Sequence, residues 1–504
     1  MKKQQSVFKV YSCFAEGVKG VISEIEVSVS PGLPTFDIIG LCDSSIRESR
    51  GRIRSALVSS GFFLPKGHIT VSISPAYMRK SGSAFDLPVA LGILFVSGQL
   101  PIEEGRKVYA EGELSLNGEI KGTPGAALRL MSIGEDMDHL LIPGDEKMSA
   151  GCAGIRAQTV DTMDDVGKVF IEGGYSPKSF EGEMKIYDDE YIDISVLKGQ
   201  EKASRAIQIS ACGMHNLLML GSPGCGKTIA GKILAGIMPQ LSPKEASQVF
   251  AINETAGLFD EKKGITRPFR YIYPGISRSQ LLGSSGNLFP GEIAMADNGI
   301  LFADEITEFP AGTLDLLRLP LEERIVRIVK EGNTYTYPAS FIFVGAGNPC
   351  KCGMLYEKGS RCVCSPNTIK RYQSKLAGPF LDRIDIITEM RSIEAKDLEE
   401  TSKKTEGLLT PDIRNMVTEV REIQKERYKD PGIFNGTVTV ADAEVLRAGK
   451  DVVTYASDAA IRGGLSARGY SKLLRVGRTI ADMEGRRDMT RNDIAEAYVY
   501  KRRL

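Results

Sequence analysis

Hydrophobic and polar positions change their spacing along the 504-residue chain. In the first third, short strand-like segments such as residues 22–29 and 66–73 alternate with helical ones, with glycine and proline at the turns. This pattern predicts an α+β domain over residues 1–178. The stretch 172–189 is polar and aperiodic, which is typical of a linker.

The middle of the chain carries continuous apolar runs separated by helical segments, a pattern that indicates buried parallel strands. After residue 390 the periodicity becomes helical, most clearly in residues 411–428. We therefore predict an α/β chain with a parallel-sheet core over residues 190–390 and a helical lid domain over residues 391–504. The apolar runs are residues 217–220, 299–303 and 341–344.

Composition narrows the class of protein without identifying a substrate. Hydrophobic residues make up 42% of the chain and charged residues 25%, which excludes wholesale disorder and fibrous repeats. Basic and acidic residues both total 64, so nucleic acid can be bound only through a local basic surface. Because no apolar run is long enough to span a membrane and no signal-peptide pattern begins the chain, we expect a cytoplasmic protein without membrane contact.

The clearest chemical motif is GSPGCGKT, a complete GxxxxGK[ST] between a predicted strand and a predicted helix. Its glycines let backbone N–H groups close around phosphate oxygens, and the helix N-terminus adds partial positive charge. We expect Lys227 to reach the β- and γ-phosphates of ATP and Thr228 to hold Mg²⁺. The predicted cofactor-binding residues are Gly221, Ser222, Pro223, Gly224, Cys225, Gly226, Lys227, Thr228 and Asp304.

Polar residues follow the next two apolar runs. GILFADE ends in Asp304, which is expected to hold Mg²⁺, and Glu305, which is expected to polarise water. FIFVGAGNP ends in Asn348, whose amide can orient the attacking water beside the γ-phosphate. These patterns predict a site for ATP hydrolysis.

Four of the nine cysteines form two CxC pairs. In a reducing cytosol, four thiolates can close a tetrahedral zinc site, and its role would be structural because no coordination position is left for water. The spacing departs from the commoner CxxC knuckle, so free buried thiols and a redox pair are the alternatives. The candidate ligands are Cys350, Cys352, Cys362 and Cys364.

With these motifs in place, the chain resembles the Mg-chelatase-like AAA+ ATPases of the YifB/ComM type over essentially its whole length. The resemblance rests on the segments 199–228, 267–270, 290–309, 347–353, 364–386 and 465–483. It implies Asn348 as sensor 1, Arg383 as an arginine finger that acts on a neighbouring subunit, and Arg468 as sensor 2. Taken without the resemblance, Arg383 is expected to form a surface ion pair with Asp382 or Asp385.

The resemblance implies a ring-forming, hexameric ATPase that uses ATP and Mg²⁺ and acts on DNA, as a branch-migration helicase in recombination or natural transformation. A chelatase-type motor that acts on a protein partner is the alternative. In such a ring, a hairpin within residues 321–341, with its turn at 331–333, and the loop 282–290 would face the pore. Its candidate DNA contacts are Arg324, Arg327 and Lys330, and the alternative is an ordinary edge hairpin.

Four basic residues recur at spacings of three and four near the end of the chain, and therefore share one face of a predicted helix. We expect this face either to be solvated or to contact phosphate or DNA. The residues are Arg468, Lys472, Arg475 and Arg478.

The chain departs from the family pattern at two places. After RPFR, members usually carry APHHT, whereas this chain has YIYPG, with Tyr273 and Pro274 at the histidine positions. The first domain resembles the S5-type fold of the Lon protease catalytic domain, but Ala84 and Ala127 stand at the nucleophile and lysine positions. We therefore predict that proteolysis is absent, and a dyad shifted to the nearby Ser83 and Lys121 is disfavoured.

Overall fold

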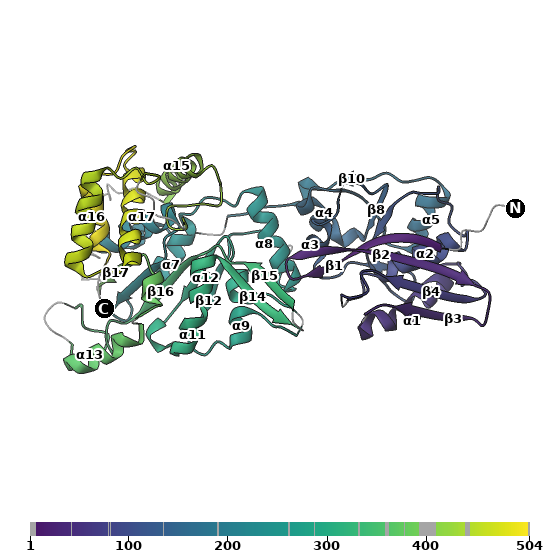
Figure 1. The fold of residues 1–504 in the computed structure, drawn as a ribbon, viewed down its shortest axis with the longest axis horizontal. Helices are drawn as coiled ribbons and strands as arrows, with labels where there is room; N and C mark the ends of the chain where they lie inside the picture. Colours follow the sequence, from purple (N-terminus) through teal and green to yellow (C-terminus); the bar gives the residue numbers. More distant parts are fainter. Residues whose placement is uncertain are drawn as a thin grey trace. The chain divides into compact units, whose positions relative to one another are not determined.

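A computed structural model gives the fold of two compact units, drawn in Figure 1. The first unit comprises residues 1–187 and 242–265, and the second comprises residues 188–241 and 266–504. The parallel sheet and the C-terminal helices therefore belong to the same compact unit. The division into three domains stays a prediction. The structure describes residues 7–41, 43–78, 80, 82–134, 136–188, 191–260, 263–286, 288–330, 333–357, 362–376, 378–392, 410–438 and 444–501.

The first unit is built on an eight-stranded mixed sheet in the order β10-β9-β8-β5-β1-β2-β4-β3. The central strands β1 and β2 are antiparallel, whereas β5 and β8 run parallel to their neighbours. This mixed α/β architecture confirms the predicted class of the N-terminal part. The strands are β1 (Val7–Glu16), β2 (Lys19–Ser30), β3 (Thr35–Ile39), β4 (His68–Ile73), β5 (Val108–Ala110), β8 (His139–Ile142), β9 (Arg156–Thr159) and β10 (Lys178–Ser179).

Helix α2 (Asp86–Val96) is buried along its whole length against this sheet. Helix α8 (Pro243–Thr255) comes from within the predicted ATPase core in sequence but packs with α3 and α4 in the first unit. Its Glu254 carboxylate accepts hydrogen bonds from the backbone N–H groups of Ala126 and Ala127, at 2.9 and 3.2 Å. The other helices are α1 (Ser44–Ser59), α3 (Ala126–Leu130), α4 (Lys147–Ala153) and α5 (Met163–Ile171), and β6 (Glu113–Leu114) pairs with β7 (Ile120–Lys121).

The second unit contains a five-stranded parallel sheet in the order β12-β13-β16-β11-β17. Every residue of the three central strands is buried, which explains why these strands read as continuous apolar runs. The predicted buried parallel strands are thereby confirmed, while β12 and β17 carried no clear sequence signal. The strands are β11 (Leu217–Gly221), β12 (Phe269–Ile272), β13 (Ile300–Ala303), β16 (Ile342–Gly347) and β17 (Ile386–Met390).

The C-terminal part is helical, as predicted, within the residues that the structure describes. Helices α15 and α17 both pack on α6 (Glu201–Gly213), and their apolar side chains join the core beside the sheet. Figure 1 shows α15, α16 and α17 in this part of the chain. The helices of this part are α15 (Thr410–Tyr428), α16 (Lys450–Gly463), α17 (Ala467–Met483) and α18 (Arg491–Val499). None of the described helices has the length and apolar character needed to cross a membrane.

The predicted basic face of α17 is partly wrong. Lys472 and Arg478 are 6% and 0% exposed, so neither is solvated nor available to DNA. The Lys472 ammonium lies 3.5 Å from an Asp385 carboxylate oxygen, and Arg478 pairs with Asp482 at 3.0 Å. Both cations are tolerated inside because each has a buried acidic partner.

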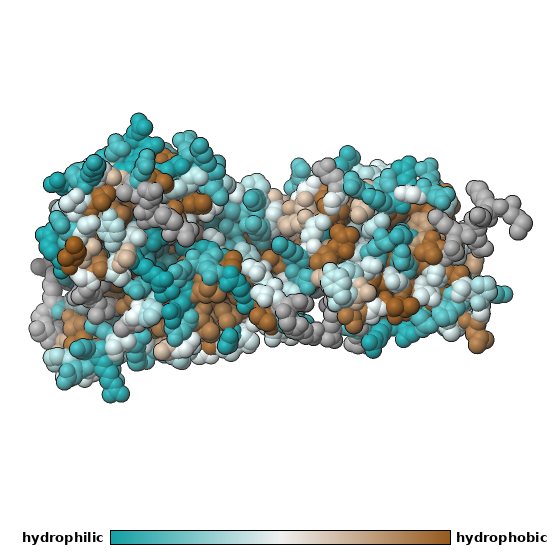
Figure 2. All heavy atoms as spheres, in the orientation of Figure 1, coloured by the Kyte–Doolittle hydropathy of each residue, from teal (hydrophilic) through white to brown (hydrophobic). Residues whose placement is uncertain are grey.

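On the visible face of each unit in Figure 2, hydrophilic side chains are interrupted by separate hydrophobic patches.

Candidate nucleotide-binding site

Parallel strands in register bring polar residues to one edge of the sheet in the second unit. Leu220 of β11 lies opposite Gly347 of β16, and Ala303 of β13 lies opposite Gly345 of β16. The phosphate loop, Asp304 and Asn348 each follow one of these strands directly. They therefore emerge together at the carboxyl edge of the sheet, which is where ligands bind in open α/β sheets.

Lys227 is the first residue of α7 (Lys227–Gly236) and folds back into the phosphate loop. Its ammonium donates to the carbonyl oxygens of Gly221 and Ser222 at 2.8 and 2.9 Å. It also lies 3.4 Å from the Asn348 Oδ1 atom. Gly224 and Gly226 have φ values of 77° and 93°, a left-handed backbone that favours glycine. The loop thus has the conformation and the cation that a phosphate group requires.

Asp304 is held from three directions. Its Oδ2 atom accepts from the Tyr271 hydroxyl at 2.9 Å and lies 3.4 Å from the Thr228 hydroxyl, while Oδ1 accepts from the Glu305 N–H at 2.9 Å. Burial raises the pKa of Tyr271 to about 12, and the hydrogen bond to Asp304 acts in the same direction. Thr228 and Asp304, the two predicted magnesium ligands, are therefore neighbours.

Glu305 is exposed and follows Asp304 in a left-handed backbone conformation, with φ of 50°. This conformation costs a residue with a side chain on the order of 1 kcal/mol, and such residues concentrate at functional sites. The turn carries Glu305 off the line of β13 at the same edge of the sheet. Its position suits a group that acts on a water molecule beside a bound phosphate.

The loop after Asn348 packs against the phosphate loop. A Cβ placed on Gly353 would lie 2.6 Å from the Pro223 Cδ atom, so the Gly353 backbone packs closely against the Pro223 ring. Glu357 accepts hydrogen bonds from the Ser222 hydroxyl and, at 2.7 Å, from the Ser392 hydroxyl. Sequence reasoning missed Glu357 because a single carboxylate in a loop carries no motif.

The four predicted zinc ligands converge in this loop. Their sulfur atoms all lie within 4.8 Å of one another, and three of the separations are 3.4, 3.6 and 3.6 Å. A tetrahedron with Zn–S bonds of 2.3 Å has sulfur separations of about 3.8 Å, so the donor set fits zinc. Backbone N–H groups of Met354 and Val363 lower the pKa of Cys352 to about 6, whereas burial raises the pKa of Cys350 to about 12. All four cysteines are free of disulfide bonds.

Arg383 lies near the amino-terminal ends of the strands, whereas Lys227 lies at their carboxyl-terminal ends. It ends a short turn just before β17, whose first residue, Ile386, lies opposite Leu217, the first residue of β11. Asn216, which precedes β11, donates its amide to the Arg383 carbonyl oxygen at 3.1 Å. Since a strand of this length spans about 16 Å, Arg383 is separated from the phosphate loop of its own chain by the length of the sheet.

Arg383 and Arg468 meet at one carboxylate. The Arg383 and Arg468 guanidinium groups contact the two oxygens of Glu322 at 2.6 and 2.9 Å. The expected ion pair of Arg383 with Asp382 or Asp385 is therefore wrong, because Glu322 comes closer and Asp385 is buried beside Lys472. The two arginines line a cavity of about 280 Å³, whose wall also includes Arg324, Lys472 and Arg475.

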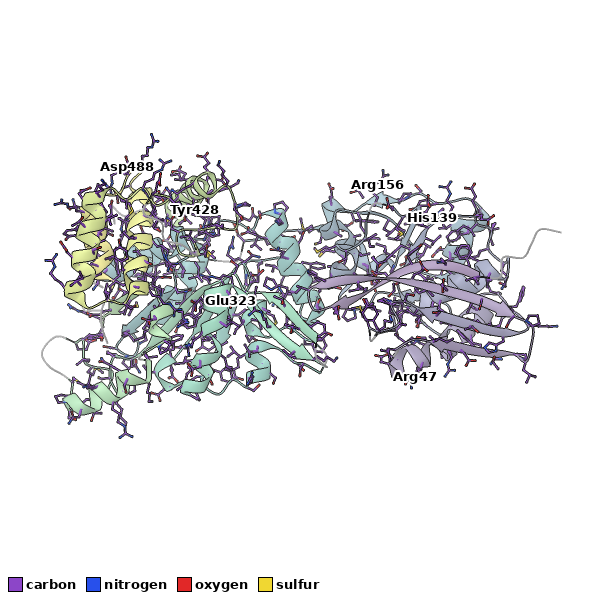
Figure 3. All side chains as sticks on the ribbon, in the orientation of Figure 1. Arg47, His139, Arg156, Glu323, Tyr428 and Asp488 are labelled. Carbon is purple, nitrogen blue, oxygen red and sulfur yellow. The ribbon has the colours of Figure 1, made fainter. Side chains whose placement is uncertain are left out.

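The predicted hairpin is confirmed over its two arms, β14 (Ile325–Lys330) and β15 (Asn333–Pro338), which pair antiparallel. Arg327 is exposed and pairs at 2.6 Å with Glu323, which is labelled in Figure 3. The Lys330 ammonium donates to the Gly286 carbonyl oxygen at 2.6 Å. Glu331 and Gly332 of the predicted turn, and Asn287 of the neighbouring loop, lie outside the described residues.

Arg324 does not project from the hairpin as predicted. It precedes β14, lines the cavity beside Arg383, and donates a hydrogen bond to the Phe341 carbonyl oxygen. Burial lowers its pKa to about 10. The residue has a left-handed backbone, with φ of 58°, and this turns its side chain away from the strand that follows.

The residues related to a protease dyad lie in the first unit. Ala84 precedes α2 and Ala127 lies in α3, and neither carries a reactive group. The Ser83 hydroxyl donates to Glu113, and the Lys121 ammonium lies 3.9 Å from Glu119. Each of the two substitute residues is thus paired with a carboxylate.

Three parts of the chain match related family descriptions. Residues 193–398 match magnesium chelatase, subunit ChlI. Residues 25–146 match subunit ChlI of Mg-chelatase, and residues 408–501 match the C-terminal part of the same subunit.

Individual relatives extend this similarity. Competence protein ComM of Haemophilus influenzae is 33% identical over 500 residues, which cover 98% of this chain and 97% of ComM. The uncharacterized protein YifB of Escherichia coli is 32% identical over 498 residues, covering 98% and 96% of the two chains. The magnesium-chelatase 38 kDa subunit of Rhodobacter capsulatus is 26% identical over 316 residues, or 58% of this chain and 81% of that subunit. Because the first two relatives span nearly all of the sequence, the chain belongs to the magnesium-chelatase ChlI family and is an AAA-type ATPase related to ComM and YifB over its full length.

Proposed function

We propose that the protein is a ring-forming ATPase that couples ATP hydrolysis to the remodelling of DNA, as a branch-migration helicase in recombination or natural transformation. The observation that carries the ATPase part is the convergence of Lys227, Asp304 and Asn348 at one edge of the parallel sheet. The DNA part is supported by the similarity to ComM, which is named as a competence protein, since competence is the capacity of a cell to take up DNA.

In this proposal each polar residue of the carboxyl edge has one task. Lys227 offsets the charge of the β- and γ-phosphates, and Thr228 and Asp304 hold Mg²⁺. The bound metal supplies positive charge that stabilises the phosphate oxygens during transfer. Glu305 accepts a proton from the attacking water, and Asn348 orients that water.

Arg383 and Arg468 act on the nucleotide of a second copy of the chain. Their position at the amino edge of the sheet supports this role, because the carboxyl edge of their own sheet is about 16 Å away. Both arginines pair with Glu322, and the resulting closeness of their guanidinium groups supports a role at the same nucleotide. A head-to-tail contact of this kind, repeated around an axis, closes a ring, and we propose a homo-hexamer.

The β14–β15 hairpin is the proposed DNA contact. Arg327 and Lys330 lie on it, and the strand alternates buried Val326 and Ile328 with exposed Arg327 and Val329. Repeated copies of these cations around a ring pore would hold a phosphate backbone although the chain as a whole is uncharged. Arg324 no longer belongs to this set, because it lies in the cavity wall.

The remaining parts of the proposal are structural. The first unit is a Lon-like, S5-type domain without protease activity. Zinc bound by the four cysteines fixes the loop between Asn348 and Glu357, which packs against the phosphate loop through Gly353 and Pro223. Metal there would stabilise the nucleotide site without taking part in the chemistry.

Substitutions in the nucleotide site separate binding from turnover. In Lys227→Ala, ATP affinity is expected to fall at least about tenfold, because the cation that faces the phosphates is lost. In Glu305→Gln, affinity should stay near wild type while kcat falls about 10²-fold or more, because a general base is lost. Equilibrium binding of a fluorescent ATP analogue and steady-state phosphate release give the two readouts. Wild-type turnover in either variant would contradict the assignment of that residue to the nucleotide site.

Metal analysis tests the cysteine cluster. Protein purified without chelator is expected to hold about one zinc ion per chain, measured by elemental mass spectrometry. The double substitution Cys350→Ser with Cys352→Ser should lose the metal, whereas Cys152→Ser, which removes a buried cysteine of the first unit, should keep it. Wild-type protein without metal would exclude the zinc site.

Salt dependence tests the DNA contact. DNA should stimulate ATP hydrolysis. The protein should displace a strand from forked DNA only when hydrolysable ATP is present. Arg327→Ala with Lys330→Ala should abolish displacement, spare basal ATPase, and flatten the salt dependence of DNA binding, since each lost phosphate contact removes about 0.7 from the log–log slope for a single strand.

The matched control for this test is Lys450→Ala with Arg491→Ala, which removes the same charge from the helical part of the chain. It should leave DNA displacement unchanged. An ATPase rate that does not respond to DNA at low salt, with wild-type fork binding by the hairpin variant, would exclude the DNA motor. The chelatase-type alternative, a motor that acts on a protein partner, would then lead.

A further inference from the structure

Tyr271 is a polar contact of the nucleotide site that no motif marked. It lies on β12, the edge strand beside β13, and its register partner is Phe302, two residues before Asp304. The two rings are stacked, with centroids 5.6 Å apart and planes 28° apart. Stacking on a fully buried Phe302 fixes the direction in which the phenol points.

The phenol reaches past the end of the neighbouring strand to the predicted magnesium ligand. Its hydroxyl lies 2.9 Å from the Asp304 Oδ2 atom. An ionised carboxylate can only accept, so the tyrosine donates this hydrogen bond. The other oxygen, Oδ1, accepts from the Glu305 N–H at 2.9 Å. With both oxygens held by donors from different directions, rotation of the carboxylate about its side-chain bonds is restricted.

A purely structural role does not account for this contact. Tyr271 is 46% exposed as a residue, so it does not belong to the core, where nearly every polar group has a hydrogen-bond partner. Tyr273, two residues further on, is 47% exposed and its hydroxyl makes no hydrogen bond among the described residues. The two tyrosines are thus close in sequence and equally exposed, but only Tyr271 forms a hydrogen bond with Asp304.

We propose that Tyr271 is a positioning residue that holds the Asp304 carboxylate in the orientation that binds Mg²⁺ with the nucleotide. The inference rests on the proposed assignment of Asp304 as a magnesium ligand. Residues that hydrogen-bond a metal-ligating carboxylate fix its direction, and their removal costs metal affinity about 10- to 100-fold. Tyr271 acts through Asp304 and does not itself touch the phosphate.

The test compares Tyr271→Phe with the matched control Tyr273→Phe. A fluorescent ADP analogue is bound to each protein in EDTA, and Mg²⁺ is then titrated while the dissociation rate of the nucleotide is followed. We expect the magnesium midpoint to rise about tenfold in Tyr271→Phe and to stay at the wild-type value in Tyr273→Phe. Nucleotide affinity in EDTA should remain near wild type in both variants, because the tyrosine acts through the metal ligand and not on the nucleotide, and kcat should remain near wild type in the control Tyr273→Phe.

Two further measurements make the result decisive. Asp304→Asn should itself raise the magnesium midpoint, and adding Tyr271→Phe to it should cause little further change, because the tyrosine acts only through the carboxylate. An unchanged midpoint in Tyr271→Phe overturns the proposal. So does weaker nucleotide binding in EDTA, which would place the effect of the phenol on the fold or on the nucleotide itself. If Asp304→Asn leaves the midpoint unchanged, the magnesium site itself is wrong, and that failure is distinguishable from the failure of Tyr271.

Discussion

Parallel strands that begin and end in register bring whatever follows them to the same edge of a sheet, and the nucleotide site is built on this constraint. Lys227, Asp304 and Asn348 are far apart in sequence, yet each stands just after one of the paired strands β11, β13 and β16. The paired strands are buried along their whole length, and their main-chain pairing within the core holds this register. The chemistry of the site therefore depends on packing beneath it.

The same register separates the arginines from the phosphate loop. β17 runs parallel to β11, so the residues that precede β17, including Arg383, lie at the amino edge of the sheet. Arg468 joins Arg383 there because Glu322 pairs with both. Within one copy of the chain, the phosphate loop and Arg383 therefore lie at opposite ends of the strands. This separation supports the proposed assembly, in which Arg383 of one copy faces the nucleotide site of the next.

The site residues that the sequence predicted best are those that directly follow a strand. The phosphate loop, Asp304 and Asn348 could be predicted because continuous apolar runs identify buried parallel strands and polar residues end them. The convergence of the four cysteines also followed from their spacing. Tyr271 and Glu357 could not be found in this way, because their contacts depend on an edge-strand register and on a loop path. Lys472 and Arg478 were misjudged since helical spacing alone does not reveal that α17 has buried acidic partners on its charged side.

The central claim is that each nucleotide site is completed by Arg383 of another copy, and complementation between two inactive variants tests it most directly. Glu305→Gln keeps Arg383, and Arg383→Ala keeps Glu305. In the proposed ring, co-expression with two affinity tags would give assemblies in which some interfaces join both intact residues. The account predicts that doubly tagged rings regain about a quarter of wild-type ATPase activity at equal, random incorporation, because one in four interfaces is intact. Activity that stays at the level of the separate variants would show that Arg383 does not serve a neighbouring site.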